Sequence, residues 1–378
     1  MAKKKIQNEH NMAYKFRIYP NEEQKIIFAK TFGCTRKVWN LILADKINYY
    51  KQNKTMLNVT PASYKKTYPY LKEIDSLALT NVQLNLEEAY KQFFAKKRKF
   101  PKFKSKKTAK KSFTTNVING NITFDGSFLK LPKIKDKIRV LAHREIPSDY
   151  VLKSVTISQT PDGEYYASLK YSYIEEYNTI SIINEAKVIG LDYASHGLYV
   201  DSNGNFADMP TYYRNSQKRL AKEQRRLSKK QKDSNNYNKQ KIKVAKIHRH
   251  TANQRQDFLH KKAKEITNLY DFVCVEDLNM QSIAKSLKLG KSTMDNGFGM
   301  FRVFLSQKLE KKGGKLVKID KFYPSSQLCH HCGYKNPITK DLNIREYECP
   351  NCHAHLNRDL NAAINIKQEG IRILNFVI

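Results

Sequence analysis

Four cysteines near the end of the chain form two pairs, and each pair has two residues between its members. The pairs are Cys329 with Cys332 and Cys349 with Cys352, and sixteen residues separate them. This spacing allows two short loops to place four thiolates tetrahedrally around one zinc ion. Because cysteine fills all four positions, the ion would have no open coordination site, and we expect it to be structural.

An acidic residue follows this cluster, and two more acids upstream share a common sequence context. Asp359 comes seven residues after Cys352, in a segment that reads as the first turn of a helix. Asp192 and Glu276 each end a short, continuously apolar segment, which is typical of a buried central strand. Acids at the ends of neighbouring buried strands meet at one edge of a sheet, where a helix carrying Asp359 would complete a triad.

Three carboxylates gathered at one place repel one another unless a cation binds between them, and magnesium is the usual solution because it prefers oxygen ligands. Two such ions, roughly 3.5–4 Å apart, would support in-line hydrolysis of a phosphodiester. The sequence therefore predicts an RNase H-like nuclease with Asp192, Glu276 and Asp359 as catalytic acids and magnesium ligands. The alternative for each acid alone is a helix cap or a salt-bridge partner. Asp277 follows Glu276 and should point to the opposite face of the strand.

The composition of the chain indicates a polyanionic partner. Its 378 residues include 69 Lys and Arg against 35 Asp and Glu, a formal net charge of +34. Such an excess predicts nucleic-acid binding through phosphate contacts, and 23 Tyr and 18 Phe add stacking surfaces for single strands or RNA. No apolar run approaches the ~20 residues of a membrane span, and no secretory signal is visible, so we expect a cytoplasmic protein without membrane contact.

Two basic segments are the candidates for this contact. The first, at 96–104, interleaves Lys and Arg with aromatic residues and includes Lys102 and Lys104. The second is a strongly basic helical region at 214–249, which includes Arg225 and Arg226. A merely solvated charged loop is the alternative for the first segment.

Hydrophobic patterning predicts the elements that position these residues. In the first half, a strand at 13–19 precedes helices at about 22–50 and 77–97, and short strands follow over 113–173. Asn119-Gly120, Asp125-Gly126 and Asp162-Gly163 are hairpin signals, so we expect a small β-barrel or sandwich interrupted by the helices. In the second half, a linker at 174–186 leads to apolar strands at 187–192, 271–276 and 316–319, with a helix at about 298–312.

Several motifs together resemble TnpB, the OrfB-type proteins of bacterial insertion sequences, which are relatives of type V CRISPR effectors. The similarity runs over nearly the whole chain, and its motifs are Lys15-Phe16-Arg17-Ile18-Tyr19-Pro20, Phe100-Pro101-Lys102-Phe103-Lys104, Gly190-Leu191-Asp192, Val275-Glu276-Asp277-Leu278, Tyr323-Pro324-Ser325-Ser326 before Cys329, and Asn357-Arg358-Asp359 with Asn361-Ala362-Ala363. Ala194 and Asn357 depart from residues that many relatives carry, Gly and Asp respectively, but neither departure removes a metal ligand.

This resemblance implies an α/β plus β-barrel fold class and a division into domains. A wedge β-barrel would comprise residues 1–20 and 101–178, with a helical recognition insert at 21–100. An RNase H-like (RuvC) nuclease domain would comprise 184–325 and 354–378, with an inserted zinc-ribbon target-nucleic-acid-binding module at 326–353.

The resemblance also implies an RNA-guided DNA endonuclease encoded by a transposable element. Its partners would be a guide RNA from the element's end and double-stranded DNA with a short AT-rich flanking motif, and the protein would be a monomer within a ribonucleoprotein. Its cofactors would be one structural zinc and two catalytic magnesium ions. Approximate position assigns the flanking-motif contacts to Tyr49, Gln83, Thr115 and Asn116, and ordinary polar surface structure is the alternative for each.

Three other functions remain open from the sequence. The same fold could occupy DNA without cutting, as a nuclease-inactive repressor, although the intact acids argue against this. A DNA strand-transferase (transposase) could use the same acids on the ends of the element. A basic zinc-ribbon accessory of the ribosome would have no need of the three acids.

Overall fold

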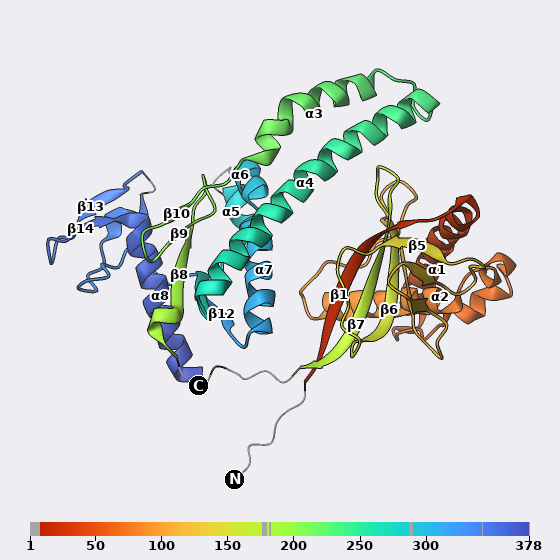
Figure 1. The fold of residues 1–378 in the computed structure, drawn as a ribbon, viewed down its shortest axis with the longest axis horizontal. Helices are drawn as coiled ribbons and strands as arrows, with labels where there is room; N and C mark the ends of the chain where they lie inside the picture. Colours follow the sequence, from red (N-terminus) through yellow and green to blue (C-terminus); the bar gives the residue numbers. More distant parts are fainter. Residues whose placement is uncertain (1–7, 176–179, 181–182, 287–289, 342, 378) are drawn as a thin grey trace, which may run out of the picture. The chain divides into compact units, whose positions relative to one another are not determined.

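The computed structural model describes residues 8–175, 180, 183–286, 290–341 and 343–377, and the chain divides after Glu176 into two compact units (Figure 1). Each unit is described by itself. No helix within the described ranges is long and apolar enough to cross a membrane.

Unit 1 is built on a curled seven-stranded antiparallel sheet with the order β2-β6-β7-β1-β5-β4-β3. The long first strand, β1, pairs with β7 along its length and with β5 at its end, where Arg17 faces Leu141. The strands are β1 (Asn8–Tyr19), β2 (Lys111–Asn116), β3 (Thr123–Phe124), β4 (Phe128–Lys130), β5 (Ile138–Leu141), β6 (Val151–Gln159) and β7 (Tyr165–Glu175).

Two helices are inserted between β1 and β2. Helix α1 (Glu22–Asn53) begins with a capping box in which Asn21 and Gln24 exchange side-chain and backbone hydrogen bonds, and α2 (Ser76–Phe94) is capped by Asp75. Phe28 and Phe32 of α1 pack into the core of the sheet, while the rest of α1 packs against α2 in a second core. The short 3-10 helices η1 (Pro61–Lys65) and η2 (Pro69–Lys72) connect α1 to α2.

Two of the three hairpins that the turn signals of unit 1 predict are confirmed. Asp162-Gly163 joins β6 to β7, and Asp125-Gly126 joins β3 to β4, with both glycines at a φ of 93°. The prediction of a hairpin at Asn119-Gly120 was wrong, because β2 before this turn pairs with β6 and not with β3. The predicted linker at 174–186 begins within β7, and its residues 176–179 and 181–182 lie outside the described part of the chain.

Unit 2 contains a five-stranded sheet with the order β10-β9-β8-β11-β12. Strands β8, β11 and β12 are parallel, and β9 returns antiparallel to β8. The strands are β8 (Val188–Tyr193), β9 (Tyr199–Asp201), β10 (Phe206–Ala207), β11 (Phe272–Glu276) and β12 (Lys315–Ile319), and the 3-10 helix η3 (Glu185–Lys187) precedes β8.

Helices cover both faces of this sheet. Ile189, Leu191, Val273 and Val275 pack against α4 (Asn235–Leu269) and α7 (Phe298–Lys311), whereas Val188, Phe272 and Cys274 pack against α8 (Arg358–Val377). Helix α3 (Tyr212–Ser228) and the first half of α4 run together beyond the sheet as a helical arm (Figure 1). The remaining elements are α5 (Met280–Ser286), α6 (Gly290–Asn296), η4 (Pro337–Lys340) and the hairpin of β13 (Glu346–Glu348) and β14 (His355–Asn357).

Two glycines allow α8 to lie directly against the sheet. A Cβ atom at Gly190 would stand 2.1 Å from the carbonyl oxygen of Ala363, and one at Gly370 would stand 2.1 Å from the Sγ of Cys274. Any side chain at Gly190 or Gly370 would therefore push α8 away from β8 or β11. This close packing fixes where the first turn of α8 lies relative to the ends of the strands.

Candidate active site

The alternation of side chains along β8 and β11 places Asp192 and Glu276 on the same face of the sheet. On β8, Val188 and Gly190 face α8, and on β11, Phe272 and Cys274 face α8. Asp192 and Glu276 are the next residues of these two series, at the carboxyl ends of adjacent parallel strands. Both acids are partly buried. The predicted juxtaposition therefore follows from the period of two along each strand.

Burial and the neighbouring acids raise the pKa of Asp192 well above its ordinary value. Burial of the carboxyl group is the largest cause, and the charges of Glu276 and Asp359 raise the pKa further, while Arg358 opposes them. Burial also raises the pKa of Glu276, although the Ser325 hydroxyl, which donates to its Oε1 at 2.5 Å, stabilises the ionised form. The Asp192 carboxyl is thus held where negative charge is costly, and a bound cation would relieve this cost.

Asp359 lies in the first turn of α8, and Asn357 caps this turn. The Asn357 Oδ1 accepts hydrogen bonds from the backbone N–H of Asp359 at 3.1 Å and of Leu360 at 3.0 Å. Asparagine serves as an N-cap about as well as aspartate does, so its presence at 357 leaves the start of α8 well defined.

Two arginines contact the Asp359 carboxylate, and the sequence analysis gave neither of them a role. Arg345 Nη1 lies 2.8 Å from Oδ2 and 3.2 Å from Oδ1, and Arg358 Nη2 lies 3.2 Å from Oδ1. The Arg345 side chain is 47% exposed, whereas Arg358 is buried and also donates to the carbonyl oxygen of Asp341. Arg345 comes from the loop between the two cysteine pairs, fourteen residues before Asp359, and nothing in its local pattern marks it.

The Asp277 side chain points to the opposite face of the sheet from Glu276, as expected. Its carboxylate lies 3.7 Å from Arg302 of α7 and 3.3 Å from Lys318, and its side chain is 57% exposed. The three candidate acids influence one another electrostatically, but their oxygens do not all lie within 4.8 Å of one another. In the described part of the chain, the four cysteines are the only group of potential metal ligands whose ligand atoms all lie this close together.

The four cysteine sulfurs are gathered as the spacing predicts. Cys329 Sγ lies 3.6 Å from Cys352 Sγ, and Cys332 Sγ lies 3.7 Å from Cys349 Sγ. Four thiolates around a zinc ion, with Zn–S bonds of about 2.3 Å, stand roughly 3.8 Å apart, so this donor set fits zinc. Two nearby histidines have other contacts, since His330 bonds to Asn361 and His353 to Glu348.

Side-chain amides of α8 connect this cysteine cluster to the helix that carries Asp359. Asn361 Oδ1 accepts from the backbone N–H of His330 at 3.0 Å, and its Nδ2 donates to the carbonyl oxygen of Leu328 at 2.7 Å. Asn365 Nδ2 donates to the carbonyl oxygens of Ser325 and Leu328. Asn361 and Asn365 are at most 2% exposed, so the loops around Cys329 and the first turns of α8 form one packed assembly.

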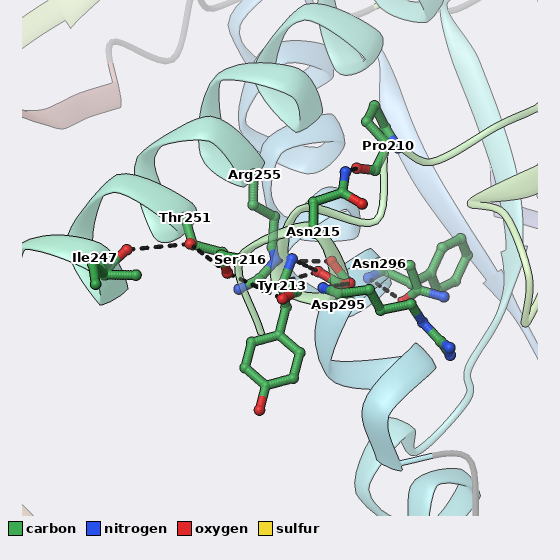
Figure 2. Close-up of polar contacts among 11 residues, drawn as sticks. Pro210, Tyr213, Asn215, Ser216, Ile247, Thr251, Arg255, Asp295 and Asn296 are labelled. Carbon is green, nitrogen blue, oxygen red and sulfur yellow. Dashed lines mark hydrogen bonds and ion pairs between the residues drawn. The ribbon is translucent and has the colours of Figure 1, made fainter. Parts of the chain in front are cut away.

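The base of the helical arm is held by a buried acid. The Asp295 carboxylate accepts from the backbone N–H groups of Tyr213 and Arg214, at the start of α3, and pairs with Arg255 of α4 at 3.2 Å (Figure 2). It therefore acts as the N-cap of α3 from a distant part of the sequence, because Thr211 makes no side-chain cap. The adjacent Asn296 donates to the Tyr193 hydroxyl at 2.9 Å, next to Asp192.

We expect Asp295→Ala to loosen the base of the arm by about 3 kcal/mol, because it leaves the Arg255 charge unpaired in a mostly buried site. Amide hydrogen exchange at the start of α3 would measure this loss. Asp257→Ala is the matched control, since Asp257 pairs with Lys261 at the surface of α4 and its loss should change stability by less than about 1 kcal/mol. Equal protection at α3 in the two variants would contradict the assignment.

The arm presents a basic groove between α3 and α4. Its open volume is about 890 Å³, and its lining includes Arg219, Arg226, Lys243, Lys246 and His250. Arg225 and Arg226, which the sequence singled out, are both exposed on α3, and Arg226 pairs with Glu223 at 2.8 Å.

The four residues of unit 1 predicted to contact nucleic acid differ in exposure and in hydrogen-bond partners. Tyr49 is 36% exposed on α1, Gln83 donates to Glu87 on α2, and Asn116 is partly buried at the end of β2. Thr115 is only 1% exposed, and its hydroxyl donates to the Asp75 carboxylate that caps α2. Thr115 is therefore held in the packing between α2 and β2.

Lys102 and Lys104 lie in a segment that is fastened to α1. The Lys102 carbonyl oxygen accepts from Trp39 Nε1 at 3.0 Å, and the backbone of Lys104 exchanges two hydrogen bonds with the Asn40 side chain. The Lys104 ammonium group lies 3.5 Å from the centroid of the Trp39 ring, and its desolvation lowers the pKa of Lys104 to about 8.

Comparison with known proteins gives the family. Family models match at residues 176–287 ("Probable transposase"), 298–366 ("Cas12f1-like, TNB domain") and 10–55 ("Helix-turn-helix domain"). A Streptomyces pristinaespiralis protein named "Putative RNA-guided DNA endonuclease" is 33% identical over 366 residues, which cover 95% of this chain and 89% of that protein. The Escherichia coli K12 protein named "Putative RNA-guided DNA endonuclease InsQ" is 29% identical, covering 96% and 93%. The chain belongs to the TnpB family, the OrfB-type proteins of insertion sequences.

A solved structure supports the fold. The chain superposes on Cas12f1, from a cryo-EM structure of the Cas12f1-sgRNA-target DNA complex, with a TM-score of 0.60 at 13% identity, over 95% of this chain and 99% of that one. With the curled sheet of unit 1 and the α/β sheet of unit 2, this likeness confirms the predicted fold class. Residues 10–55, despite the description of their family model, form β1 and the single helix α1.

Proposed function

We propose that this chain is an RNA-guided DNA endonuclease encoded by a transposable element. The observation that carries the proposal is the convergence of Asp192, Glu276 and Asp359 on the α8 side of a parallel sheet, in a chain that belongs to the TnpB family. The relatives named above as RNA-guided DNA endonucleases align over nearly its full length.

In this proposal, Asp192, Glu276 and Asp359 hold two magnesium ions. Their carboxylates are the hard oxygen donors that suit magnesium. Magnesium, when bound, would activate the attacking water and stabilise the leaving oxygen of an in-line displacement. The strands fix Asp192 and Glu276, the hydroxyl of Ser325 orients Glu276, and the cap at Asn357 sets the start of the helix that carries Asp359.

Arg345 contacts the scissile phosphate in this proposal. Its guanidinium lies against Asp359 yet remains 47% exposed, so it can donate to an incoming phosphate oxygen while staying at the site. Cys329, Cys332, Cys349 and Cys352 hold one structural zinc, which keeps the loop that carries Arg345 in place.

The remaining assignments follow the domains expected from the resemblance. The wedge sheet and its helical insert, within unit 1, read a short AT-rich flanking motif through Tyr49, Gln83 and Asn116, and pairing with the guide reads the rest of the target. The arm residues Arg225 and Arg226 contact nucleic-acid backbone. The protein acts as a monomer in a ribonucleoprotein, in the bacterial cytoplasm.

The test is to purify the chain from cells that carry its native element and to sequence the RNA that accompanies it. We expect one abundant structured RNA that ends in a variable segment, because the chain's positive charge and aromatic surfaces favour a stable RNA partner. The second step uses plasmids that carry a target matching the variable segment, each next to a different AT-rich flanking sequence. In the presence of magnesium, the ribonucleoprotein should cut those plasmids whose flanking sequence it recognises.

The controls separate this function from its competitors. A plasmid with a mismatched target, and ribonucleoprotein treated with ribonuclease, should both remain uncut. A random mixture of cellular RNA, together with specific binding of the RNA-free chain to the element's ends, would contradict the proposal and indicate a strand-transferase.

A further inference from the structure

Three phenylalanines are exposed within ten residues of one another in the sequence, at the end of α2 and in the segment that follows it. Phe94 is 63% exposed, Phe100 is 41% exposed and Phe103 is 58% exposed. All three lie in unit 1, away from the catalytic carboxylates in sequence, and none has a role in the function proposed above. Exposure of so much aromatic surface within ten residues is costly in water and indicates a partner with apolar faces.

Contacts with neighbouring rings hold two of these side chains in place. Tyr90, which is buried, stacks with Phe94 at a centroid distance of 6.2 Å and meets Phe100 edge-on at 5.6 Å. Phe93 meets Phe100 edge-on at 5.2 Å. The rings are therefore positioned before any ligand arrives, which lowers the entropic cost of binding.

Phe103 is positioned by its backbone. The residues on either side of it, Lys102 and Lys104, are those fastened to Trp39 and Asn40 of α1, and Pro101 before them is buried. With the backbone anchored on both sides, the Phe103 ring projects outward from a fixed point. The segment is thus an ordered extension of the α1–α2 pair.

The segment that carries Phe100 and Phe103 has side-chain charges of one sign. Residues 96–111 contain no acid and ten cations, and all ten residues are exposed: Lys96, Lys97, Arg98, Lys99, Lys102, Lys104, Lys106, Lys107, Lys110 and Lys111. The Lys104 ammonium group itself, however, is desolvated against the Trp39 ring. A partner must therefore combine apolar planar faces with a dense negative backbone. Single-stranded nucleic acid has both, whereas the bases of a duplex are stacked on one another and present only their edges.

We propose that Phe94, Phe100 and Phe103 form a stacking platform for unpaired bases of the guide RNA. This inference rests on the proposed function, which supplies the RNA. We commit to RNA because the proposed function keeps the guide bound before, during and after cleavage, whereas a displaced DNA strand is present only after the guide has paired with its target. The surrounding lysines would contact its phosphates.

The first test compares two probes that carry the same charge. An eight-residue oligouridine and an abasic ribose-phosphate chain of equal length are each titrated with the full-length chain. Stacking on an aromatic side chain contributes about 1–3 kcal/mol per base, or roughly 5- to 150-fold in affinity. We expect oligouridine to bind at least about tenfold tighter than the abasic chain. Phe94→Leu/Phe103→Leu, which leaves only Phe100, should lose most of this preference while abasic binding is unchanged.

A matched control is available in the same unit. Phe128 on β4 is 44% exposed and lies outside the basic segment, so Phe128→Leu should retain the full preference for oligouridine. Phe94→Leu/Phe103→Leu keeps Phe100, whose ring contacts are part of the packing, so the variant should keep the thermal midpoint of the parent. An unchanged base preference in this variant would overturn the platform, as would tighter binding to anionic phospholipid vesicles than to oligouridine.

The second test identifies the strand. A photo-crosslinking benzoyl-phenylalanine at position 103 is introduced into the ribonucleoprotein as purified, with target DNA added. We expect crosslinks to unpaired nucleotides of the co-purified RNA, and crosslinks to DNA alone would overturn the assignment. Target cleavage is measured in parallel with the native chain. If the native chain cleaves its target but position 103 gives no RNA crosslinks, only the stacking platform is refuted. If the native chain shows no guided cleavage, the proposed function is refuted, whatever the crosslinks show.

Discussion

Asp192→Asn is expected to abolish DNA cleavage, lowering the rate by about 10⁴-fold, the scale of losing a catalytic carboxylate. The amide keeps the shape of the side chain at the end of β8 but removes the negative charge that a metal ion needs. Guide-dependent DNA binding should be unchanged, because neither the basic arm nor unit 1 depends on this side chain. Gel-shift and cleavage assays on the same ribonucleoprotein would measure both.

The same substitution should raise the thermal stability of the metal-free protein. The Asp192 carboxyl is buried beside Glu276 and Asp359, and this environment raises its pKa because negative charge is disfavoured there. Asparagine removes that repulsion, so the metal-free variant should unfold at a higher temperature than the metal-free parent. Added magnesium should stabilise the parent strongly and the variant weakly, because one ligand is missing.

Asp277→Asn is the matched control for this prediction. Asp277 follows Glu276 directly, but it is 57% exposed and contacts Arg302 and Lys318. Cleavage should persist in this variant, and the magnesium-dependent stabilisation should match that of the parent. Guided cleavage that survives Asp192→Asn would show that the catalytic assignment is wrong, since the fold would remain intact in both variants.

The part of the site that could be predicted from the sequence is the part encoded by local periodicity. Asp192 and Glu276 each end an apolar strand, and the period of two along a strand decides which face each occupies. The cysteine spacing likewise predicts that four sulfurs meet, because each pair lies within one short loop. These features needed no knowledge of how distant segments pack.

Contacts between distant segments could not be predicted in this way. Arg345 reaches Asp359 from the loop between the cysteine pairs, and Ser325 reaches Glu276 across 49 residues. Asp295 caps α3 from a position about eighty residues further along the chain. Thr115 was chosen by its approximate position, and its burial depends on how α2 packs against β2, which no local pattern reveals. The hairpin expected at Asn119-Gly120 failed for a related reason, because turn residues do not specify which strands pair.

Cys349→Ser is expected to remove the zinc and, with it, the order of the loops on which Asp359 and Arg345 depend. A structural zinc contributes about 10–16 kcal/mol of apparent binding free energy to a small domain, far more than the few buried apolar residues around Cys349 can replace. Elemental analysis should show zinc falling from one per chain to none. Cys34→Ser, at the buried free cysteine of α1, should retain the metal.

Loss of the zinc should displace the first turn of α8, which carries Asp359. Asn361 and Asn365 would lose the partners that Leu328, His330 and Ser325 provide, and the first turn of α8 would no longer be held against the loop before it. A displacement of about 1 Å in a catalytic group costs about 10²-fold in rate, so we expect cleavage to fall at least that far. RNA binding by unit 1 should persist in Cys349→Ser, because none of the ribbon's residues belongs to it. Full cleavage by a zinc-free chain would mean that α8, packed against β8 and β11 through Gly190 and Gly370, positions Asp359 without help from the cysteine cluster.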